Sequence, residues 1–301
     1  MKKACLFPGQ GSQFPHMLNE FVNTHTFEVA SNYLGFDARE LTTELALEKT
    51  AAVQLSLLIS EVAAYESFKA AGVRFDYVAG HSVGAFGAAV AAGVISFTDA
   101  LDSVRLRGDL MEAAHPVGYG MGVVLGLEES VIKKLIESVV TDNDPVYLAN
   151  LNAPLQITIS GTLNGLEKVL KLALEKGAHT ATLLDVVTPS HSPLLNKVSG
   201  ELAVALEEIS FNDPKIPYVS NKRARLLYKS VDVKADLVKS VATSVRWHDA
   251  TTLLYERGVR LFVEMPPGSV LTKLATQAFP DARGMSVSDN GIDNCIYLAN
   301  R

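Results

Sequence analysis

The stretch VAGHSVGAFGAAVAAGV, residues 78–94, places one serine between glycines and continues as a run of small residues. The apolar residues 75–80 predict a strand, and the alanine-rich residues 83–92 predict a helix. A strand that reverses sharply into a helix puts Ser82 at the tip of the turn, where flanking glycines let neighbouring backbone come close. The pattern G-x-S-x-G in this setting predicts a nucleophile elbow; the alternative is a structural turn in which Ser82 caps the helix.

The composition favours a globular α/β protein. Of the 301 residues, 48% are hydrophobic and 20% are charged, which is ordinary for a globular chain. The 21 glycines and an aromatic content of 7% suit close packing of helices on a sheet. A formal net charge of −6 argues against a nucleic-acid partner, because such proteins usually carry a basic excess.

We expect a cytoplasmic protein with no membrane segment, no metal and no bound cofactor. The apolar residues of MKKACLF stop at Pro8, and no stretch approaches the roughly 20 apolar residues that span a bilayer. Cys5 and Cys295 lie near opposite ends of the sequence and fit neither a metal site nor a disulfide framework. No phosphate-binding loop or nucleotide fingerprint is present.

The residues 119–188 have an order of elements of their own. The hydrophobic pattern predicts strand, helix, strand, strand, helix and strand at 121–127, 128–140, 146–152, 155–161, 163–177 and 179–186. This order is the ferredoxin-like, split βαβ pattern. The parts before and after it, 1–118 and 189–301, alternate strands and helices and would close around one parallel sheet. We therefore expect a large α/β subdomain with a small subdomain, 119–188, inserted into it.

A serine hydroxyl is a poor nucleophile without a base, so Ser82 needs a histidine. His81 is its neighbour in sequence, and adjacent side chains diverge at a tight turn. His191 follows the predicted strand TLLDVVT, which places it just past a sheet edge, as active-site residues of α/β proteins often are. Position alone makes His191 the candidate base; the alternative is a histidine at a helix start. The acid that hydrolases carry between serine and histidine is not obvious here.

Six stretches now give a specific resemblance. They are LFPGQGSQ (6–13), GHSVG (80–84), RLRGDLM (105–111), NAP (152–154), PSH (189–191) and EMPPGSVLTKL (264–274). In this order they resemble the malonyl-CoA:acyl-carrier-protein transacylases over essentially the whole chain. The resemblance implies an α/β-hydrolase-like core with an inserted ferredoxin-like subdomain. It also implies an S-malonyltransferase that works by a ping-pong mechanism through a malonyl-serine.

The resemblance assigns roles to three side chains. Ser82 matches the nucleophile, His191 the base, and Arg107 the arginine that pairs with the free carboxylate of the malonyl group. The last assignment is chemically sensible, because an arginine offers a planar, two-pronged donor that fits a carboxylate. Without the resemblance, Arg107 would be interpreted as a solvated surface arginine in the middle of a helix.

The resemblance also implies supporting groups. The backbone N–H groups of Gln10 and Val83 match an oxyanion hole. Asn152 lies in the N-x-P stretch near the site, whereas Gln54 is a weaker match because the chain reads QLSL where the family reads QPAL. A backbone carbonyl in SVRW (244–247), around Arg246, is expected to orient His191 in place of an acid.

Ala85 is the residue that separates two branches of the family. Members that serve fatty-acid synthesis usually read GHSLGE followed by an aromatic residue, whereas this chain reads GHSVGAF. Together with GYGM (118–121), GHSVGAF is more similar to the malonyltransferase (epsilon) subunit of malonate decarboxylase. This favours loading of that enzyme's carrier subunit, with Ala85 at the rim of the site. The alternative is a malonyl-CoA:acyl-carrier-protein transacylase of fatty-acid or polyketide synthesis.

Two functions of other classes stay open. A serine thioesterase or esterase would share Ser82 and His191, but Arg107 and the missing acid favour acyl transfer. A non-catalytic, carrier-binding subunit would have no need of all three side chains together.

Either transferase would take malonyl-CoA as substrate and an acyl carrier protein, usually acidic, as partner. The stretch SNKRARLLYK (220–229) supplies four basic residues in a short span: Lys222, Arg223, Arg225 and Lys229. It is a candidate contact for carrier acidic residues or CoA phosphates. The alternative is an ordinary solvated loop.

Overall fold

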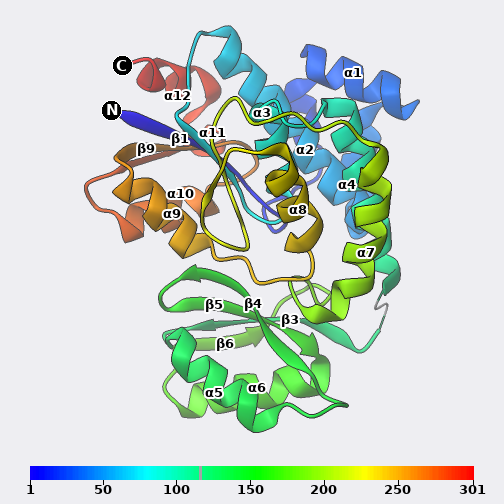
Figure 1. Ribbon diagram of the computed structural model, residues 1–301, viewed down its shortest axis with the longest axis vertical. Coiled ribbons are helices and arrows are strands. Elements are labelled where there is room, and N and C mark those ends of the chain that lie inside the picture. The colour runs from blue at the N-terminus through cyan, green and yellow to red at the C-terminus, as the bar shows by residue number, and fades with distance from the viewer. Residues whose placement is uncertain (115–116) are drawn as a thin grey trace.

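The computed structural model describes residues 1–114 and 117–301, and in these ranges the strands form two separate sheets (Figure 1). The strands of the larger sheet are β1 (Lys2–Phe7), β2 (Tyr77–Gly80), β7 (Tyr218–Val219), β8 (Leu226–Leu227), β9 (Val259–Glu264) and β10 (Arg283–Ser286). They run in the order β10-β9-β1-β2-β7-β8. Neighbours pair in parallel except β7 and β8, which are antiparallel.

Helices cover both faces of this sheet (Figure 1). The α-helices are α1 (His25–Leu34), α2 (Thr50–Ala70), α3 (Gly84–Ala91), α4 (Phe97–Ala114), α7 (Asn196–Ala205), α8 (Ser230–Ser240), α9 (Trp247–Glu256), α10 (Val270–Ala278), α11 (Val287–Asn290) and α12 (Ile292–Ala299). Short 3-10 helices are η1 (Met17–Phe21), η2 (Ala38–Thr42), η3 (Ala46–Glu48), η4 (Pro193–Leu195) and η5 (Leu206–Glu208). The predicted helix at 83–92 corresponds to α3.

The alternation of side chains along β1 explains why two hydrophobic cores form. Cys5 and Phe7 belong to the core beneath α2 and α3, whereas Ala4 and Leu6 belong to the core on the other face of the sheet. Successive residues of a strand point to opposite faces, so a strand that is apolar throughout is buried on both sides.

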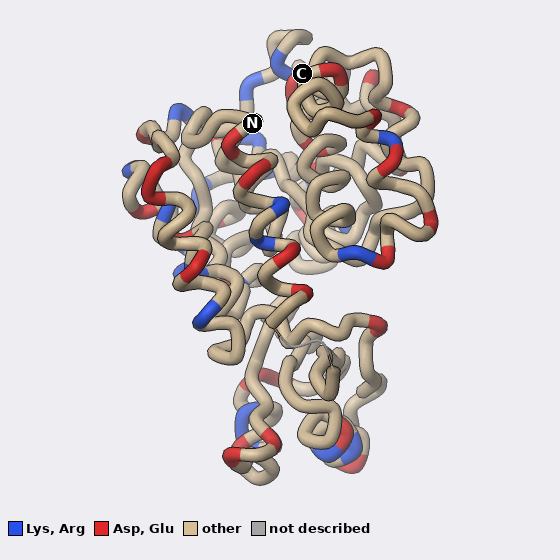
Figure 2. Tube along the Cα trace, turned by 90° about the vertical axis from the view of Figure 1, so that its right-hand side faces the viewer, with Lys and Arg blue, Asp and Glu red and all other residues tan. Residues whose placement is uncertain are grey.

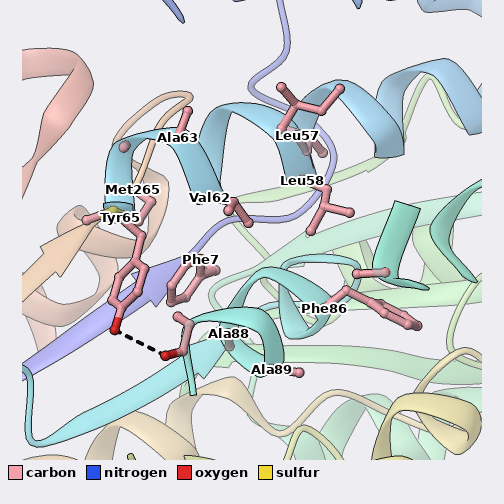
Figure 3. Packing of buried hydrophobic residues seen from close by; sticks show 14 of the residues in the cluster. Phe7, Leu57, Leu58, Val62, Ala63, Tyr65, Phe86, Ala88, Ala89 and Met265 are labelled. Carbon is pink, nitrogen blue, oxygen red and sulfur yellow. Dashed lines mark hydrogen bonds between the residues drawn. The ribbon is translucent and has the colours of Figure 1, made fainter. Parts of the chain in front are cut away.

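Helix α2 is buried nearly all round, which fits its continuous run of apolar and small residues. Figure 3 shows its side chains facing Phe7 of β1 and the small residues of α3. The hydroxyl of Tyr65 donates a hydrogen bond of 3.1 Å to the carbonyl of Ala91 at the end of α3. Because α3 is rich in alanine, it lies close to both α2 and the sheet, and the start of α3 is thereby fixed.

The second sheet is built from β3 (Tyr119–Leu125), β4 (Val146–Ala153), β5 (Gln156–Thr162) and β6 (Thr180–Leu183), with α5 (Glu129–Val139) and α6 (Leu163–Glu175). It is antiparallel, in the order β4-β5-β3-β6, and packs its own core against its two helices. The expected α/β fold with a parallel sheet and a βαββαβ insertion is confirmed. The boundaries at 118/119 and 188/189 stay a prediction.

The two parts of the molecule are joined at Val245. Its N–H donates to the carbonyl of Ala149 and its own carbonyl accepts from the N–H of Leu151, over 2.9 and 2.8 Å. These two hydrogen bonds hold β4 next to the residues just before α9. In the view of Figure 2, acidic and basic residues are interspersed over both parts of the chain.

Candidate active site

Ser82 lies at the tip of a tight turn between β2 and α3. Its φ is +55°, a left-handed conformation that a non-glycine residue rarely adopts. A Cβ on Gly80 would lie 2.1 Å from the carbonyl oxygen of Gly84, and one on Gly84 would lie 2.3 Å from the carbonyl oxygen of Phe7. The glycines are therefore needed so that backbones can touch, and the predicted placement of Ser82 at the tip of the turn is confirmed.

The side chain of His191 lies within hydrogen-bonding distance of Ser82. Its Nε2 lies 2.8 Å from Oγ of Ser82, and its Nδ1 lies 2.7 Å from the carbonyl oxygen of Ser240. Because a carbonyl only accepts, the ring nitrogen Nδ1 carries the proton and Nε2 is left to accept from the serine hydroxyl. The Ser82 side chain is thus hydrogen-bonded to the imidazole of His191 and does not cap α3.

The expected acceptor for His191, a carbonyl within 244–247 around Arg246, is wrong. The acceptor is Ser240, the last residue of α8, and the last carbonyls of a helix have no partner within the helix. Arg246 instead donates from Nε to Asp249 over 2.5 Å and lies 3.8 Å from Glu129. Its side chain belongs to the rim of a neighbouring cavity.

Burial keeps the imidazole of His191 neutral. Desolvation and then the nearby charge of Arg107 lower the pKa of His191 from 6.5 to about 3, and the hydrogen bond to Ser240 only partly opposes this. A neutral imidazole with a free lone pair on Nε2 can take the proton of an attacking hydroxyl at neutral pH.

Arg107 is fully buried beside the serine. It lies on α4, and its Nη2 is 3.3 Å from Oγ of Ser82. Its Nη1 donates to Oε1 of Gln54 over 2.7 Å, while its Nε has no partner. Among the described residues no carboxylate lies within ion-pair distance of this guanidinium. The surface interpretation is therefore wrong, and the site contains a buried cation that lacks an anion.

Desolvation lowers the pKa of Arg107 to about 10, so that the guanidinium is still charged at neutral pH. A buried charge is costly unless it is paired and hydrogen-bonded. The free Nε and the absent carboxylate are what a site for an anionic group requires.

Gln54 connects this cation to the loop after β1. Its Oε1 accepts from Arg107 and its Nε2 donates to Oε1 of Gln10 over 2.9 Å. The backbone N–H groups of Gln10 and Val83 donate to no acceptor in residues 1–114 and 117–301, whereas that of Ser82 donates to Oδ1 of Asn221. Two unpaired N–H groups, one just before α3, are suited to a developing oxyanion.

Asn152 contacts the side chain of His81, the residue before the serine. Its Oδ1 is 3.0 Å from Nε2 of His81, whose ring meets Trp247 edge-on at 5.4 Å between centroids. Burial lowers the pKa of His81, and Asn152 occupies its Nε2. His81 therefore does not serve Ser82 as a base, in agreement with the divergence expected at the turn.

Ala85 does not lie at the rim of the site, contrary to expectation. Its side chain is fully buried in the hydrophobic core beneath α2 and α3. The residue after the elbow points inward because the first turn of α3 packs against that core. Ala85 therefore presents no surface to a substrate or a carrier.

A cavity of about 580 Å³ lies beside the histidine, between β4, α5 and the residues 242–246. His191 contributes to its wall, and three basic residues line it: Lys133, Lys222 and Arg246. Of the predicted basic stretch, Lys222 thus reaches the cavity and Lys229 is paired with Asp213 over 2.9 Å. Arg223 and Arg225 are exposed.

The described residues hold no group of three or more His, Cys, Asp or Glu side chains that could bind a metal ion. Cys5 and Cys295 are buried and unpaired. No helix in the described ranges is both long and apolar enough to cross a bilayer.

Comparisons with known proteins find similarity over nearly the whole chain. The acyl transferase domain family matches residues 5–290. The malonyl CoA-acyl carrier protein transacylase of Bacillus subtilis (strain 168) is 37% identical over 303 residues, which cover 96% of this chain and 94% of the relative.

Solved structures give the same result. The acyl-carrier-protein S-malonyltransferase of Burkholderia pseudomallei 1710b has a TM-score of 0.93 at 36% identity, covering 99% of this chain and 100% of that one. A malonyl-transacylase solved in complex with its type II PKS acyl-carrier protein has a TM-score of 0.93 at 33% identity, covering 99% of each chain.

The fold and the comparisons define an acyltransferase. Within that class, the chain belongs to the malonyl-CoA:acyl-carrier-protein transacylase family.

Proposed function

We propose that the protein transfers a malonyl group from CoA to the thiol of an acyl carrier protein, through a malonyl ester on Ser82. The observation that carries the proposal is Arg107, a fully buried cation that has no acidic partner among the described residues and lies 3.3 Å from the serine hydroxyl. A malonyl thioester brings its own carboxylate, which would complete this pair. An acetyl group brings none.

The first half-reaction acylates the serine. Oγ of Ser82 attacks the thioester carbonyl while its proton passes to Nε2 of His191, which lies 2.8 Å away. The carbonyl oxygen becomes an oxyanion that the N–H groups of Gln10 and Val83 stabilise. When the carbon–sulfur bond breaks, CoA leaves as a thiol with the proton from His191, and the malonyl group stays on Ser82.

The second half-reaction reverses these steps with another thiol. The carrier's thiol gives its proton to His191 and attacks the ester carbonyl, and Ser82 regains its hydrogen as it leaves. The cavity beside His191, with Lys133, Lys222 and Arg246 on its wall, is suited to a thiol on a long arm that ends in a phosphate. The pairing of Arg107 with the malonyl carboxylate is maintained throughout.

The relatives favour a carrier protein of fatty-acid or polyketide synthesis over the carrier subunit of malonate decarboxylase. The relatives are malonyl CoA-acyl carrier protein transacylases, and one solved relative is in complex with a type II PKS acyl-carrier protein. The contrary indication was GHSVGAF together with GYGM (118–121), and the burial of Ala85 removes that residue from any surface that a carrier meets. The malonate decarboxylase role and a cytoplasmic location stay predictions.

A single mass-spectrometric experiment tests the proposal. Incubation with malonyl-CoA should add one malonyl group to Ser82, and Ser82→Ala should abolish the adduct. A carrier thiol should discharge the adduct much faster than water does. Faster discharge by water would identify a thioesterase instead, and the absence of both an adduct and released malonate would contradict both. Discharge by acyl carrier protein compared with the malonate decarboxylase carrier decides the pathway.

A further inference from the structure

The nucleophile turn is held by a side chain that lies 139 residues further along the chain. The amide of Asn221 donates from Nδ2 to the carbonyl of Gly80 over 2.8 Å and accepts at Oδ1 from the N–H of Ser82 over 3.0 Å. Asn221 is buried, so water does not compete for either bond.

These two bonds reproduce the pattern of a parallel ladder. In such a ladder one residue donates to the carbonyl before its opposite number and accepts from the N–H after it. β2 and β7 pair in this way at Val78–Tyr218 and Ala79–Val219, where β7 ends, and β2 ends one residue later at Gly80. The side-chain amide of Asn221 takes the place of the next strand residue, opposite His81. The sheet is thus extended to the serine although the backbone has already turned.

Asn221 is itself fixed by a buried carboxylate. Asp236 on α8 accepts from the N–H of Asn221 over 3.0 Å, from the hydroxyl of Tyr218 over 3.1 Å and from the hydroxyl of Ser220. The N–H of Lys222 adds a longer contact of 3.4 Å. A carboxylate with this many donors determines the path of residues 220–222, which carry Asn221 to the turn.

The same helix also orients the base. Ser240, whose carbonyl accepts from Nδ1 of His191, follows Asp236 by four residues on α8 and so lies on the same face of the helix. One turn of α8, gold in Figure 1, therefore contacts His191 directly and Ser82 through Asn221.

On this basis we propose that Asn221, held by Asp236, is a positioning residue for Ser82. It keeps the serine in its left-handed conformation, so that Oγ points at Nε2 of His191. It also occupies the N–H of Ser82, which leaves the N–H groups of Gln10 and Val83 as the pair available to the oxyanion. The inference rests on the proposed function for the identity of the acyl donor, but not for the placement of the serine.

Asn221→Ala tests this inference when the rate and the amplitude of acylation are measured separately. Quenched-flow with malonyl-CoA should still give one malonyl group per chain, because the protein is folded. The acylation rate constant should fall by about 10- to 100-fold, since a misplacement of the order of 1 Å costs this much. The KM should change by less than about threefold, because Arg107 and the cavity are untouched. A lower amplitude with an unchanged rate constant would mean a structural role only and would overturn the inference.

Val233→Ala is the matched control. Val233 is a buried residue of α8 and contacts neither Asn221 nor the serine through a hydrogen bond. This variant should lose stability but keep its rate constant per acylated site. An equal fall of the rate constant in Val233→Ala would overturn the inference. If Asn221→Ala does not fold, Asn221→Asp replaces it: the acceptor for Ser82 stays and the donor to Gly80 is lost. Full amplitude with a lower rate constant is again expected, and an unchanged rate constant overturns the inference.

Phenylmethanesulfonyl fluoride separates failure of this inference from failure of the proposed function. The hydroxyl of Ser82 gives its proton to Nε2 of His191 as Oγ bonds to the sulfur of the reagent and fluoride leaves, so that the reagent reports on the serine without a malonyl group. If the unmodified protein takes the sulfonyl group but no malonyl, the proposed function fails. The inference still requires Asn221→Ala to be sulfonylated about 10- to 100-fold more slowly. Equal sulfonylation rates would overturn it.

Discussion

The site has a closed end around Arg107 and an open end at the cavity beside His191. The positive charges at these two ends differ in whether they already have acidic partners. At the closed end, Arg107 is fully buried and has no carboxylate partner in residues 1–114 and 117–301. At the open end, Lys133 pairs with Glu129 over 2.7 Å and Arg246 with Asp249 over 2.5 Å, both in contact with solvent. The closed end therefore depends on a substrate for its anion, whereas the open end already has anions of its own.

This difference teaches where selectivity resides. A buried, unpaired charge changes the free energy of a complex strongly when its partner arrives, because both are shielded from water. Exposed pairs contribute about 0–1 kcal/mol and weaken further in salt. The closed end is thus suited to choosing the acyl group, and the open end to attracting whatever carries it.

The largest effect is expected for Arg107→Ala. Malonyl transfer should lose ~2–5 kcal/mol of transition-state stabilisation, because the carboxylate would be buried unpaired. Acetyl transfer should fall much less. The measurement is kcat/KM for both acyl-CoA donors. Arg105→Ala is the control, since Arg105 lies on the same helix but is exposed and paired with Asp102. Equal losses on both donors would contradict the pairing of Arg107 with the malonyl carboxylate.

A second change should fill the closed end with an internal anion. Gln54→Glu places a carboxylate against Nη1 of Arg107, where Oε1 of Gln54 now accepts over 2.7 Å. Malonyl transfer should lose about 1.5–3 kcal/mol, because the substrate must compete for a charge-assisted bond. Acetyl transfer should change less. The KM for malonyl-CoA measures this competition. An unchanged KM would show that Gln54 does not share Arg107 with the substrate.

At the open end the expected effects are small and depend on salt. Lys133→Glu or Lys222→Glu should weaken carrier binding by less than about 1 kcal/mol, and added salt should remove most of the difference. The KM for the carrier at two ionic strengths measures this. Lys134→Glu is the control, because Lys134 is exposed on α5 but does not line the cavity. A loss as large as that of Arg107→Ala would remove the distinction between the two ends.

The smallest effect is expected when the pH is lowered. Because the pKa of His191 is lowered to about 3, its base form persists, and kcat/KM for acylation should vary less than about twofold between pH 8 and 5. In Arg107→Ala the acid limb should move to higher pH, since the charge of Arg107 is one cause of the lowered pKa. An acid limb near 6.5 in the unmodified protein would contradict the buried, neutral histidine.

The same shift affects folding stability with a definite sign. Between pH 6.5 and about 3 the unfolded chain binds a proton at His191 that the folded chain does not bind. The contribution of His191 to stability is therefore present above pH 6.5 and decreases as the pH falls below it.

Local patterns predicted the parts of the site that depend on neighbouring residues. The strand, the serine and the helix of residues 75–92 follow from hydrophobic pattern and glycine spacing, and the structure places Ser82 at the turn as expected. The βαββαβ insertion follows from the same kind of signal. Arg107 carried no such signal, because a mid-helix arginine is usually exposed, and only the resemblance pointed to it.

Long-range contacts to backbone groups could not be predicted in this way. The carbonyl that orients His191 belongs to Ser240 and not to residues 244–247, and any residue supplies a carbonyl, so sequence offers no mark of it. Asn221 lies just beyond β7, which stops at Val219. Its position directly after a strand, at the same sheet edge as Ser82, was the available signal.

The sequence by itself determined that Ser82 would stand on a sharp turn between a strand and a helix. The physical reason is steric: only glycine at 80 and 84 lets the backbones touch there. The tertiary structure alone decided that Arg107 would be buried without an acid, and that α8 would align Ser82 and His191. Those properties depend on which distant side chains are absent or present around a group, and packing, not local pattern, sets them.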